Sequence, residues 1–262
     1  MRILCPILSA CLAALIAAPL LAADAAPAAP KLYVLHQEIV RPAGLKDYEE
    51  TNHEIIAAFQ QHRDMLPHFA FTTVAGEDFT YNFITPVPDF AYAGTVYDLV
   101  DKVGRTLGEA KWADLLKRNG ATIESMNDSV FIEDPSMSYA PASPRLKPEE
   151  DRYFHFDLYY IQTGREADAD AVARDFAALF RARNMPDGYR LMKLAFGHDA
   201  PLLVVSVGAR DADDFAAQDA KMRKTLGAEG EALFARAFAL TRRFDRRSGW
   251  VRPDLSLAPA GK

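Results

Sequence analysis

The feature that most constrains the fold is a repeated order of elements. Residues 153–162 alternate large apolar side chains with polar ones, which predicts a β-strand, and residues 32–40 predict the same kind of strand in the first half. Each half then predicts a helix, two strands joined by a turn, a second helical region and a last strand. The Thr-Leu-Gly of residues 106–108 recurs at residues 225–227, 119 positions later. The chain is therefore predicted to contain two copies of one α+β unit.

The repeat divides the chain into segments of different composition. We expect a leader over residues 1–25, a first repeat over 31–139, a linker over 140–152 and a second repeat over 153–257. The linker prediction rests on prolines spaced among charged residues, a composition typical of segments between domains. Each repeat is long enough to bury a core of its own.

The N-terminal segment predicts export. A positive Met1-Arg2 precedes a continuous run of apolar or small side chains over residues 3–23, and residues 23–25 (Ala-Asp-Ala) match an A-x-A cleavage pattern. This is the pattern of a secretory signal peptide. We therefore expect a periplasmic or secreted protein with no stable membrane span after cleavage. The alternative is an uncleaved anchor, because the apolar run is long enough to cross a bilayer.

Both cysteines of the sequence lie in the predicted leader. Loss of Cys5 and Cys11 on cleavage would leave no disulfide, no thiolate metal site and no cysteine nucleophile. Residues 8–11 (Leu-Ser-Ala-Cys) also resemble a lipobox, so lipidation of Cys11 is an alternative. The apolar run continues well past Cys11, which argues against it.

The element order of each half is the ferredoxin-like pattern, an antiparallel sheet with its helices on one face. Two fused copies can bury their remaining sheet faces against each other, which predicts an α+β fold of two ferredoxin-like βαββαβ repeats in a barrel-like arrangement. Over residues 31–257 this order resembles the dimeric α+β barrel superfamily, with NIPSNAP-like domains as the nearest members. The resemblance implies one of the roles found in that superfamily: small-molecule monooxygenase, haem-handling enzyme or binding protein.

The first strand of each repeat supplies the best candidate site. We expect the large apolar side chains of these strands to pack on the helices, so the polar ones point into the barrel. At an offset of 121 positions, His36 matches Asp157 and Glu38 matches Tyr159. The grouped side chains could bind a polar ligand or move protons; the alternative is a satisfied polar network. The residues of this site are His36, Glu38, His155, Asp157 and Tyr159.

Two further candidate residues come from basic stretches. Arg190, on the second strand of the second repeat, could supply a cation to an anionic ligand, or could belong to a solvated edge strand. Trp250 stands in an arginine-rich stretch, residues 242–252, that could hold a carboxylate or phosphate with the indole as a stacking surface. The alternative for the first of these arginines is favourable placement at a helix C-terminus.

Composition and motifs argue against several common classes. The formal net charge of −6 does not suit non-specific nucleic-acid binding, which needs clustered Lys and Arg. The sequence has no glycine-rich phosphate loop, no G-x-S-x-G and no H-E-x-x-H, so the nucleotide, hydrolase and zinc-protease classes lose support. We expect no metal site.

Three functions remain open. The leading one is binding of a small molecule in a mixed aromatic and polar cavity between the two repeats. The second is a cofactor-poor oxygenase or isomerase that uses His36, His155 and Asp157 as acid–base groups. The third is a non-catalytic interaction protein. The cofactor is unknown: an inward histidine could ligate haem, although no motif points to haem. Exposed edge strands could pair two copies into a homodimer.

Overall fold

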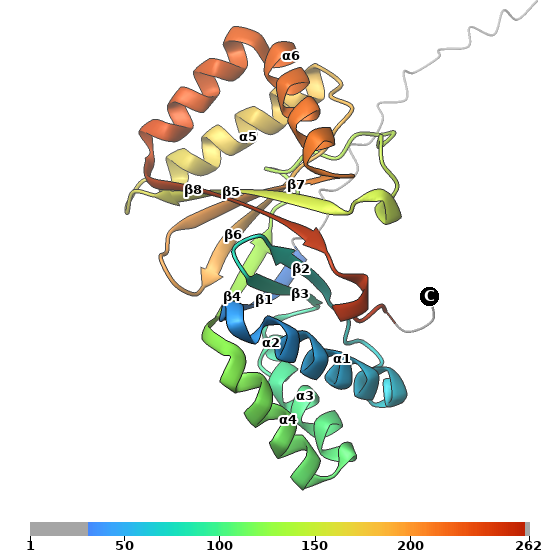
Figure 1. Cartoon of the computed structure of the whole chain (residues 1–262). Coiled ribbons are helices and arrows are strands. Elements are labelled where there is room, and N and C mark those ends of the chain that lie inside the picture. The colour runs from blue at the N-terminus through green and yellow to red at the C-terminus, as the bar shows by residue number, and fades with distance from the viewer. Residues whose placement is uncertain (1–30, 260–262) are drawn as a thin grey trace, which may run out of the picture.

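The computed structural model describes residues 31–259 (Figure 1). The predicted leader, with both cysteines, lies outside the described residues, so export stays a prediction. The first half contains β1 (Lys31–Val40), α1 (Leu45–Gln61), β2 (Thr72–Gly76), β3 (Thr80–Val87), α2 (Phe90–Ala93), α3 (Val96–Gly104), α4 (Glu109–Thr122) and β4 (Ile123–Glu133). The second half contains β5 (Tyr153–Ile161), α5 (Glu166–Ala182), β6 (Arg190–Phe196), β7 (Leu202–Ala209), α6 (Ala212–Ala239) and β8 (Thr241–Val251).

The strands of the described chain close into one barrel. Their order around it is β1-β3-β2-β8-β5-β7-β6-β4. Each half contributes four neighbouring strands, so two half-sheets meet along two seams. β2 pairs with β8 at one seam and β4 pairs with β6 at the other, both antiparallel. The structure confirms the predicted fold class, two βαββαβ repeats joined as an α+β barrel within one chain.

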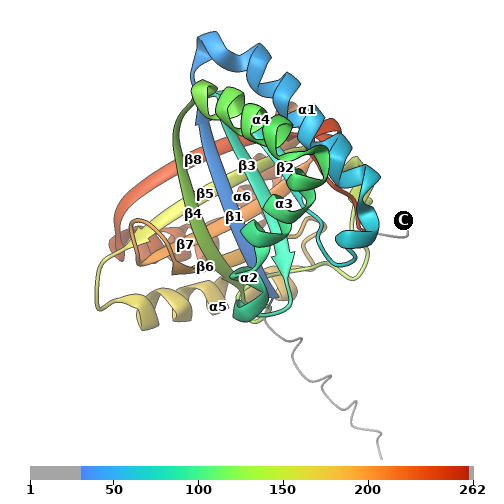
Figure 2. The same ribbon diagram turned by 90° about the horizontal axis from the view of Figure 1, so that it is seen from below.

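Helices cover the outside of each half-sheet. In Figure 1, α5 and α6 lie above the second half-sheet, and the helices of the first half lie below the first half-sheet. Figure 2 shows α1, α3 and α4 crossing the outer face of the first half-sheet. The inner faces of the two half-sheets enclose the interior of the barrel, called the lumen here. No helix within residues 31–259 combines the length and apolar character that a membrane crossing needs.

Each half-sheet carries apolar side chains on both faces. This follows from the architecture, because one face packs on helices and the other faces the lumen. The helix-side core of the first half includes Ile55, Phe59, Phe69, Phe71, Trp112 and Leu115. The lumen core includes Phe131, Leu158, Tyr160, Leu202 and Val204, with Leu35 and Phe156 packed against it.

The C-terminal elements differ in part from their predictions. The sequence predicts a helical region over residues 211–240 with a break near Gly227, and α6 is interrupted there, where Gly227 has φ 54° and ψ −145°. The sequence also predicts a last strand over residues 249–252, whereas β8 begins at Thr241. Arginines on both faces of β8 hide its alternation, since charged side chains occupy inward and outward positions alike.

The end of the described chain returns to the first half. Beyond β8, the backbones of Leu257 and Phe71 exchange hydrogen bonds of 3.0 Å in both directions. The hydroxyl of Thr73 donates to the carbonyl of Leu255 at 2.5 Å. Leu255 and Leu257 are both buried, so this C-terminal segment is part of the first half's core.

Barrel closure changes the expectation about strand edges. Each strand of the barrel has a neighbour on both sides, so β6, which carries Arg190, is not an edge strand. The prediction that exposed edge strands pair two copies into a dimer is therefore wrong, because the backbone groups of strands in a closed barrel are already paired. A homodimer through other surfaces stays a prediction.

Candidate functional site

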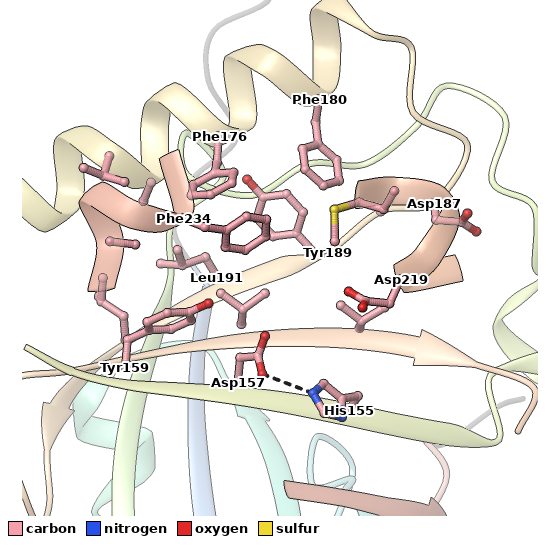
Figure 3. Close-up of a pocket in the computed structure, with 18 of the residues that line it drawn as sticks. His155, Asp157, Tyr159, Phe176, Phe180, Asp187, Tyr189, Leu191, Asp219 and Phe234 are labelled. Atoms are coloured by element: carbon pink, nitrogen blue, oxygen red, sulfur yellow. Dashed lines mark hydrogen bonds and ion pairs between the residues drawn. The ribbon is translucent and has the colours of Figure 1, made fainter. Parts of the chain in front are cut away.

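Two cavities flank the second half-sheet, one on each of its faces. The first lies between the outer face of β5, β6 and β7 and the helices α5 and α6; we call it the helix-side pocket (Figure 3). The second lies in the lumen and is lined by both halves of the chain, with aromatic and polar side chains. A mixed cavity between the two repeats, as the sequence predicts, is therefore present.

The helix-side pocket has mainly apolar walls. Its volume is ≈ 140 Å³. The helices supply Ala169, Val172, Ala173, Phe176, Phe180, Met222 and Phe234, and the strands supply Leu191, Leu203 and Val205. The turn before β6 adds Met185 and Tyr189. A ligand in this space would be held mainly by apolar contact.

A chain of polar side chains lies at the sheet side of the pocket. His155 and Asp157 are two positions apart on β5, so they share a face, and the Nε2 atom of His155 lies 3.1 Å from Oδ1 of Asp157. The Nδ1 atom of His155 lies 2.9 Å from the hydroxyl of Ser248 on β8. Arg246 donates to the same Oδ1 of Asp157 at 3.1 Å. The imidazole stacks on Phe215 of α6, with ring centroids 4.1 Å apart.

Figure 3 shows the carboxylate of Asp157 rising from β5 into the pocket, with the phenol of Tyr159 beside it. Burial raises the pKa of Tyr159, so its hydroxyl stays protonated and can donate. Because Oδ1 of Asp157 already accepts from His155 and Arg246, a ligand would meet a carboxylate with a fixed orientation. A group of this kind can accept a proton or a hydrogen bond from a ligand.

Two buried polar atoms of the pocket have no hydrogen-bond partner among the described residues. They are the hydroxyl of Tyr189 and Oε1 of Gln218, whose residues are only 9% and 8% exposed. Burial raises the pKa of Tyr189, so its hydroxyl is neutral and can donate. An unpaired buried polar group costs about 1–3 kcal/mol, which makes a ligand or water that pairs with it favourable.

The orientation of the Gln218 amide follows from its neighbour. Its Nε2 donates to Asp214 at 3.2 Å. Hydrogen bonds from Arg145 lower the pKa of Asp214 to about 2, so Asp214 is a carboxylate that can only accept. The amide nitrogen must therefore face Asp214. Oε1 is left as an acceptor that lacks a donor.

The two faces of the first strands are exchanged relative to the sequence prediction. His155, Asp157 and Tyr159 lie on the helix side, whereas Phe156, Leu158 and Tyr160 line the lumen. Alternation fixes which residues share a face, but both faces of these strands are buried, so it could not fix which face meets the helices. The prediction that the five polar residues meet inside the barrel is wrong. Three of them share the helix-side pocket.

His36 and Glu38, the other two of these five residues, form a matching cluster in the first half. Nε2 of His36 lies 3.1 Å from Oε1 of Glu38, and its Nδ1 lies 2.8 Å from Asp128 on β4. Each first strand thus carries a His-x-acid pair whose second ring nitrogen contacts the last strand of its half. His36 corresponds to His155 at an offset of 119, so the offset of 121 is wrong here. Tyr48 and Tyr97 also bond to this cluster, so their phenols occupy the space beside it.

Arg190 and Trp250, the two candidates from the basic stretches, lie outside the helix-side pocket. Arg190 is exposed, with its guanidinium 5.7 Å from the ring centre of Phe154. Trp250 is 41% exposed and packs edge-on against Tyr153. The sequence reasoning missed Tyr189 and Gln218. Neither carries a motif: Tyr189 follows a Pro-Asp-Gly turn, and Gln218 is an ordinary polar position of a helix.

The pocket residues do not fit haem held by a histidine. An axial ligand needs a free ring nitrogen. Among the described residues that line the helix-side pocket, His155 is the one imidazole, and both of its nitrogens are engaged. Both nitrogens of His36 are engaged as well. Within residues 31–259 no group of three or more His, Cys, Asp or Glu side chains is placed to hold a metal ion.

The chain was compared with known proteins. No family model and no curated protein matches the sequence. Solved structures do match: an anthrone oxidase-like protein has a TM-score of 0.54 and 13% identity, covering 88% of this chain and 94% of that chain. A candidate monooxygenase from Lactobacillus acidophilus has a TM-score of 0.53 and 4% identity, covering 88% of this chain and 96% of its own. A mutant chlorite dismutase from Candidatus Nitrospira defluvii has a TM-score of 0.50 and 10% identity, covering 85% of this chain and 92% of its own.

The chain has the dimeric α+β barrel fold. Identities this low show the fold alone and leave activity to the site. The narrower resemblance to NIPSNAP-like domains stays a prediction.

The His36 cluster predicts a pH dependence of stability. Burial disfavours the imidazolium, but hydrogen bonds and charge from Glu38 and Asp128 outweigh it and raise the pKa of His36. A raised pKa stabilises the fold fully below the unfolded value of about 6.5, and this stabilisation is lost as pH rises through the folded pKa. Urea unfolding at about pH 5.5 and about pH 8.5 should show wild type losing more stability than His36→Gln. Equal losses would contradict the prediction.

A pair of buried tyrosines tests the unpartnered hydroxyl of Tyr189. Tyr189→Phe should leave the free energy of unfolding unchanged or raise it by up to about 1 kcal/mol, because an unpaired buried hydroxyl is removed. The matched control is Tyr139→Phe, since the Tyr139 hydroxyl donates to the carbonyl of Met185 at 2.8 Å. That variant should lose about 1–2 kcal/mol. Chemical denaturation measures both; a larger loss for Tyr189→Phe would show that its hydroxyl is already paired.

Proposed function

We propose that the protein binds a compact, ring-shaped apolar molecule carrying hydroxyl or carbonyl groups in the helix-side pocket. The observation that carries the proposal is the pair of unpartnered polar atoms, the Tyr189 hydroxyl and Gln218 Oε1, inside apolar walls. A ligand hydroxyl can donate to Oε1, and a ligand oxygen can accept from Tyr189. The apolar ring would replace water against Phe176, Phe180 and Phe234.

The size of the pocket limits the ligand. A volume of ≈ 140 Å³ is close to that of engineered apolar cavities of about 150 Å³ that take up benzene. A single substituted ring therefore fits within the pocket as it stands. Larger ligands would need α5 and α6 to move apart, or would extend out of the pocket.

The neighbours in fold support small-molecule chemistry. One is named as anthrone oxidase-like and another as a candidate monooxygenase, and both adopt this fold over most of their length. We also propose that the protein is exported, on the leader pattern of residues 1–25 alone. In that case its ligand is a molecule of the periplasm or the surroundings.

A second candidate function is an enzyme that removes a proton from the bound molecule. The observation that favours it is the Asp157 carboxylate, held by His155 and Arg246 at the wall of the pocket. His36 takes no part, because it lies in the other half of the chain, in the cluster beside Tyr97. The acid–base group would therefore be the His155–Asp157 pair alone.

Binding of p-cresol against toluene tests the first proposal. The two ligands share a ring and differ by one hydroxyl, so p-cresol should bind more tightly to wild type in isothermal titration calorimetry. Tyr189→Phe should remove part of this preference, by about 1–2 kcal/mol for one lost hydrogen bond. Ala173→Leu should weaken both ligands because it fills the pocket, and the exposed Ala178→Leu on the same helix is its control. No binding of either ligand to wild type would refute the proposal.

Oxygen uptake tests the enzyme candidate. With hydroquinone as the probe, a single ring whose deprotonation precedes its oxidation by oxygen to benzoquinone and hydrogen peroxide, wild type should consume oxygen faster than a protein-free sample. Asp157→Asn keeps the shape of the side chain but removes its basicity, so the rate should fall by a factor of about 100 or more. An oxygen electrode measures both. Equal rates for the variant and wild type would remove Asp157 from the chemistry, while the p-cresol titration would still stand on its own.

A further inference from the structure

We propose that the lumen holds a second, separate binding site for a small organic carboxylate. The cavity there has a volume of ≈ 230 Å³ and is lined by strands of both repeats. It lies on the opposite face of β5 from the helix-side pocket, because Phe156 and Leu158 line the lumen while His155 and Asp157 line the pocket. The two sites can therefore be filled independently.

A row of amide side chains crosses one wall of this cavity. Asn82 on β3 and Asn127 on β4 both stand opposite Gln37 on β1, so the three amides lie side by side. Gln37 Nε2 donates to Oδ1 of Asn82 at 2.8 Å, which fixes the orientation of both groups. The structure records no side-chain hydrogen bond for Asn127 among the described residues. Its amide remains available as a donor to an anion.

An arginine faces the amide row from the other half-sheet. Arg247 on β8 lines the cavity, and its Nη1 lies 3.5 Å from Oε1 of Gln37, at the long limit of a hydrogen bond. Within residues 31–259 no carboxylate forms an ion pair with Arg247. Its neighbours differ: Arg243 pairs with Asp199 at 2.8 Å and Arg246 pairs with Asp157 at 3.1 Å. Arg242 of the same stretch also has no ion pair among the described residues, but it donates to the backbone carbonyls of Ile161 and Asp199. Among the described arginines that line the lumen cavity, Arg247 is thus the one without a partner charge.

The cavity is lined by two arginines, Arg243 and Arg247, and by two aspartates, Asp78 and Asp199, so an anion is favoured by the donors of Arg247 itself and not by the summed charge of the lining. Asp199 also lines the cavity, but Arg243 neutralises it. Asp78 lines the cavity too, and its Oδ1 accepts from the backbone of Thr80 at 3.2 Å. A guanidinium presents two parallel donors that match the two oxygens of a carboxylate, and Asn127 can add a third donor.

The rest of the cavity wall suits the apolar part of such a ligand. One step along the strands from the amide row, Leu35 stands between Ile84 and Ser129. Aromatic and aliphatic side chains follow, Phe131 on the same half-sheet as Leu35 and the others on β5 and β7 of the opposite half-sheet. Phe131, Phe156, Leu158, Tyr160, Leu202 and Val204 all line this cavity. A ligand with one carboxylate and one short apolar or aromatic body matches both parts.

Benzoate is the probe, titrated into the full-length protein by isothermal titration calorimetry. Wild type should bind benzoate, and Arg247→Gln should weaken binding by about tenfold or more, the usual effect of losing a hydrogen bond to a charged group. Arg183→Gln is the control, because Arg183 is an exposed arginine just after the end of α5 that pairs with Glu229. Benzamide, which has the same ring without the charge, should bind wild type and Arg247→Gln equally weakly.

Two outcomes would overturn the proposal. The first is benzoate binding that is absent in wild type at millimolar concentration, or unchanged by Arg247→Gln. The second is loss of benzoate binding in Ala173→Leu, which would place the ligand in the helix-side pocket instead. Because Arg247 is exposed, its substitution should leave the melting temperature unchanged, and circular dichroism checks this.

Discussion

Closure of two half-sheets into one barrel is the constraint on which the rest of the structure depends. An open half-sheet of this kind would leave backbone groups unpaired along two edges, and the two seams pair them. Closure also forces every strand to bury both of its faces. One face packs on helices and the other faces the lumen, so the chain gains two distinct places in which side chains can converge. Both cavities follow from this double burial.

The two halves share one arrangement of polar side chains but differ in what surrounds it. Each carries a His-x-acid pair on its first strand, with the acid 3.1 Å from Nε2 of the histidine. In the first half, the phenols of Tyr48 and Tyr97 bond to this group and occupy the space beside it. In the second half, α5 and α6 leave a pocket beside the pair. The space beside the His-x-acid pair is thus filled by phenols in the first half and open as a pocket in the second.

The sequence predicted the repeat and the barrel well, because element order and periodicity are local properties. It placed His155, Asp157 and Tyr159 together correctly, since alternation puts residues i and i+2 on one face. It chose the wrong face, because Phe156 and Leu158 are as apolar as the helix-side residues. Tyr189 and Gln218 could not be found from sequence. Their importance lies in missing hydrogen-bond partners, which depends on packing between distant elements.

The C-terminal segment determines when the first half can finish folding during synthesis. Phe71 and Thr73 belong to the first half, yet their partners Leu257 and Leu255 are among the last residues of the described chain. The first half is therefore made early on the ribosome but keeps unpaired backbone and uncovered apolar surface until residues 255–257 have been made. Contacts of such long range make folding slow. The N-terminal half should need protection from aggregation during synthesis, and neither repeat should be obtainable as an intact unit by cutting the chain between them.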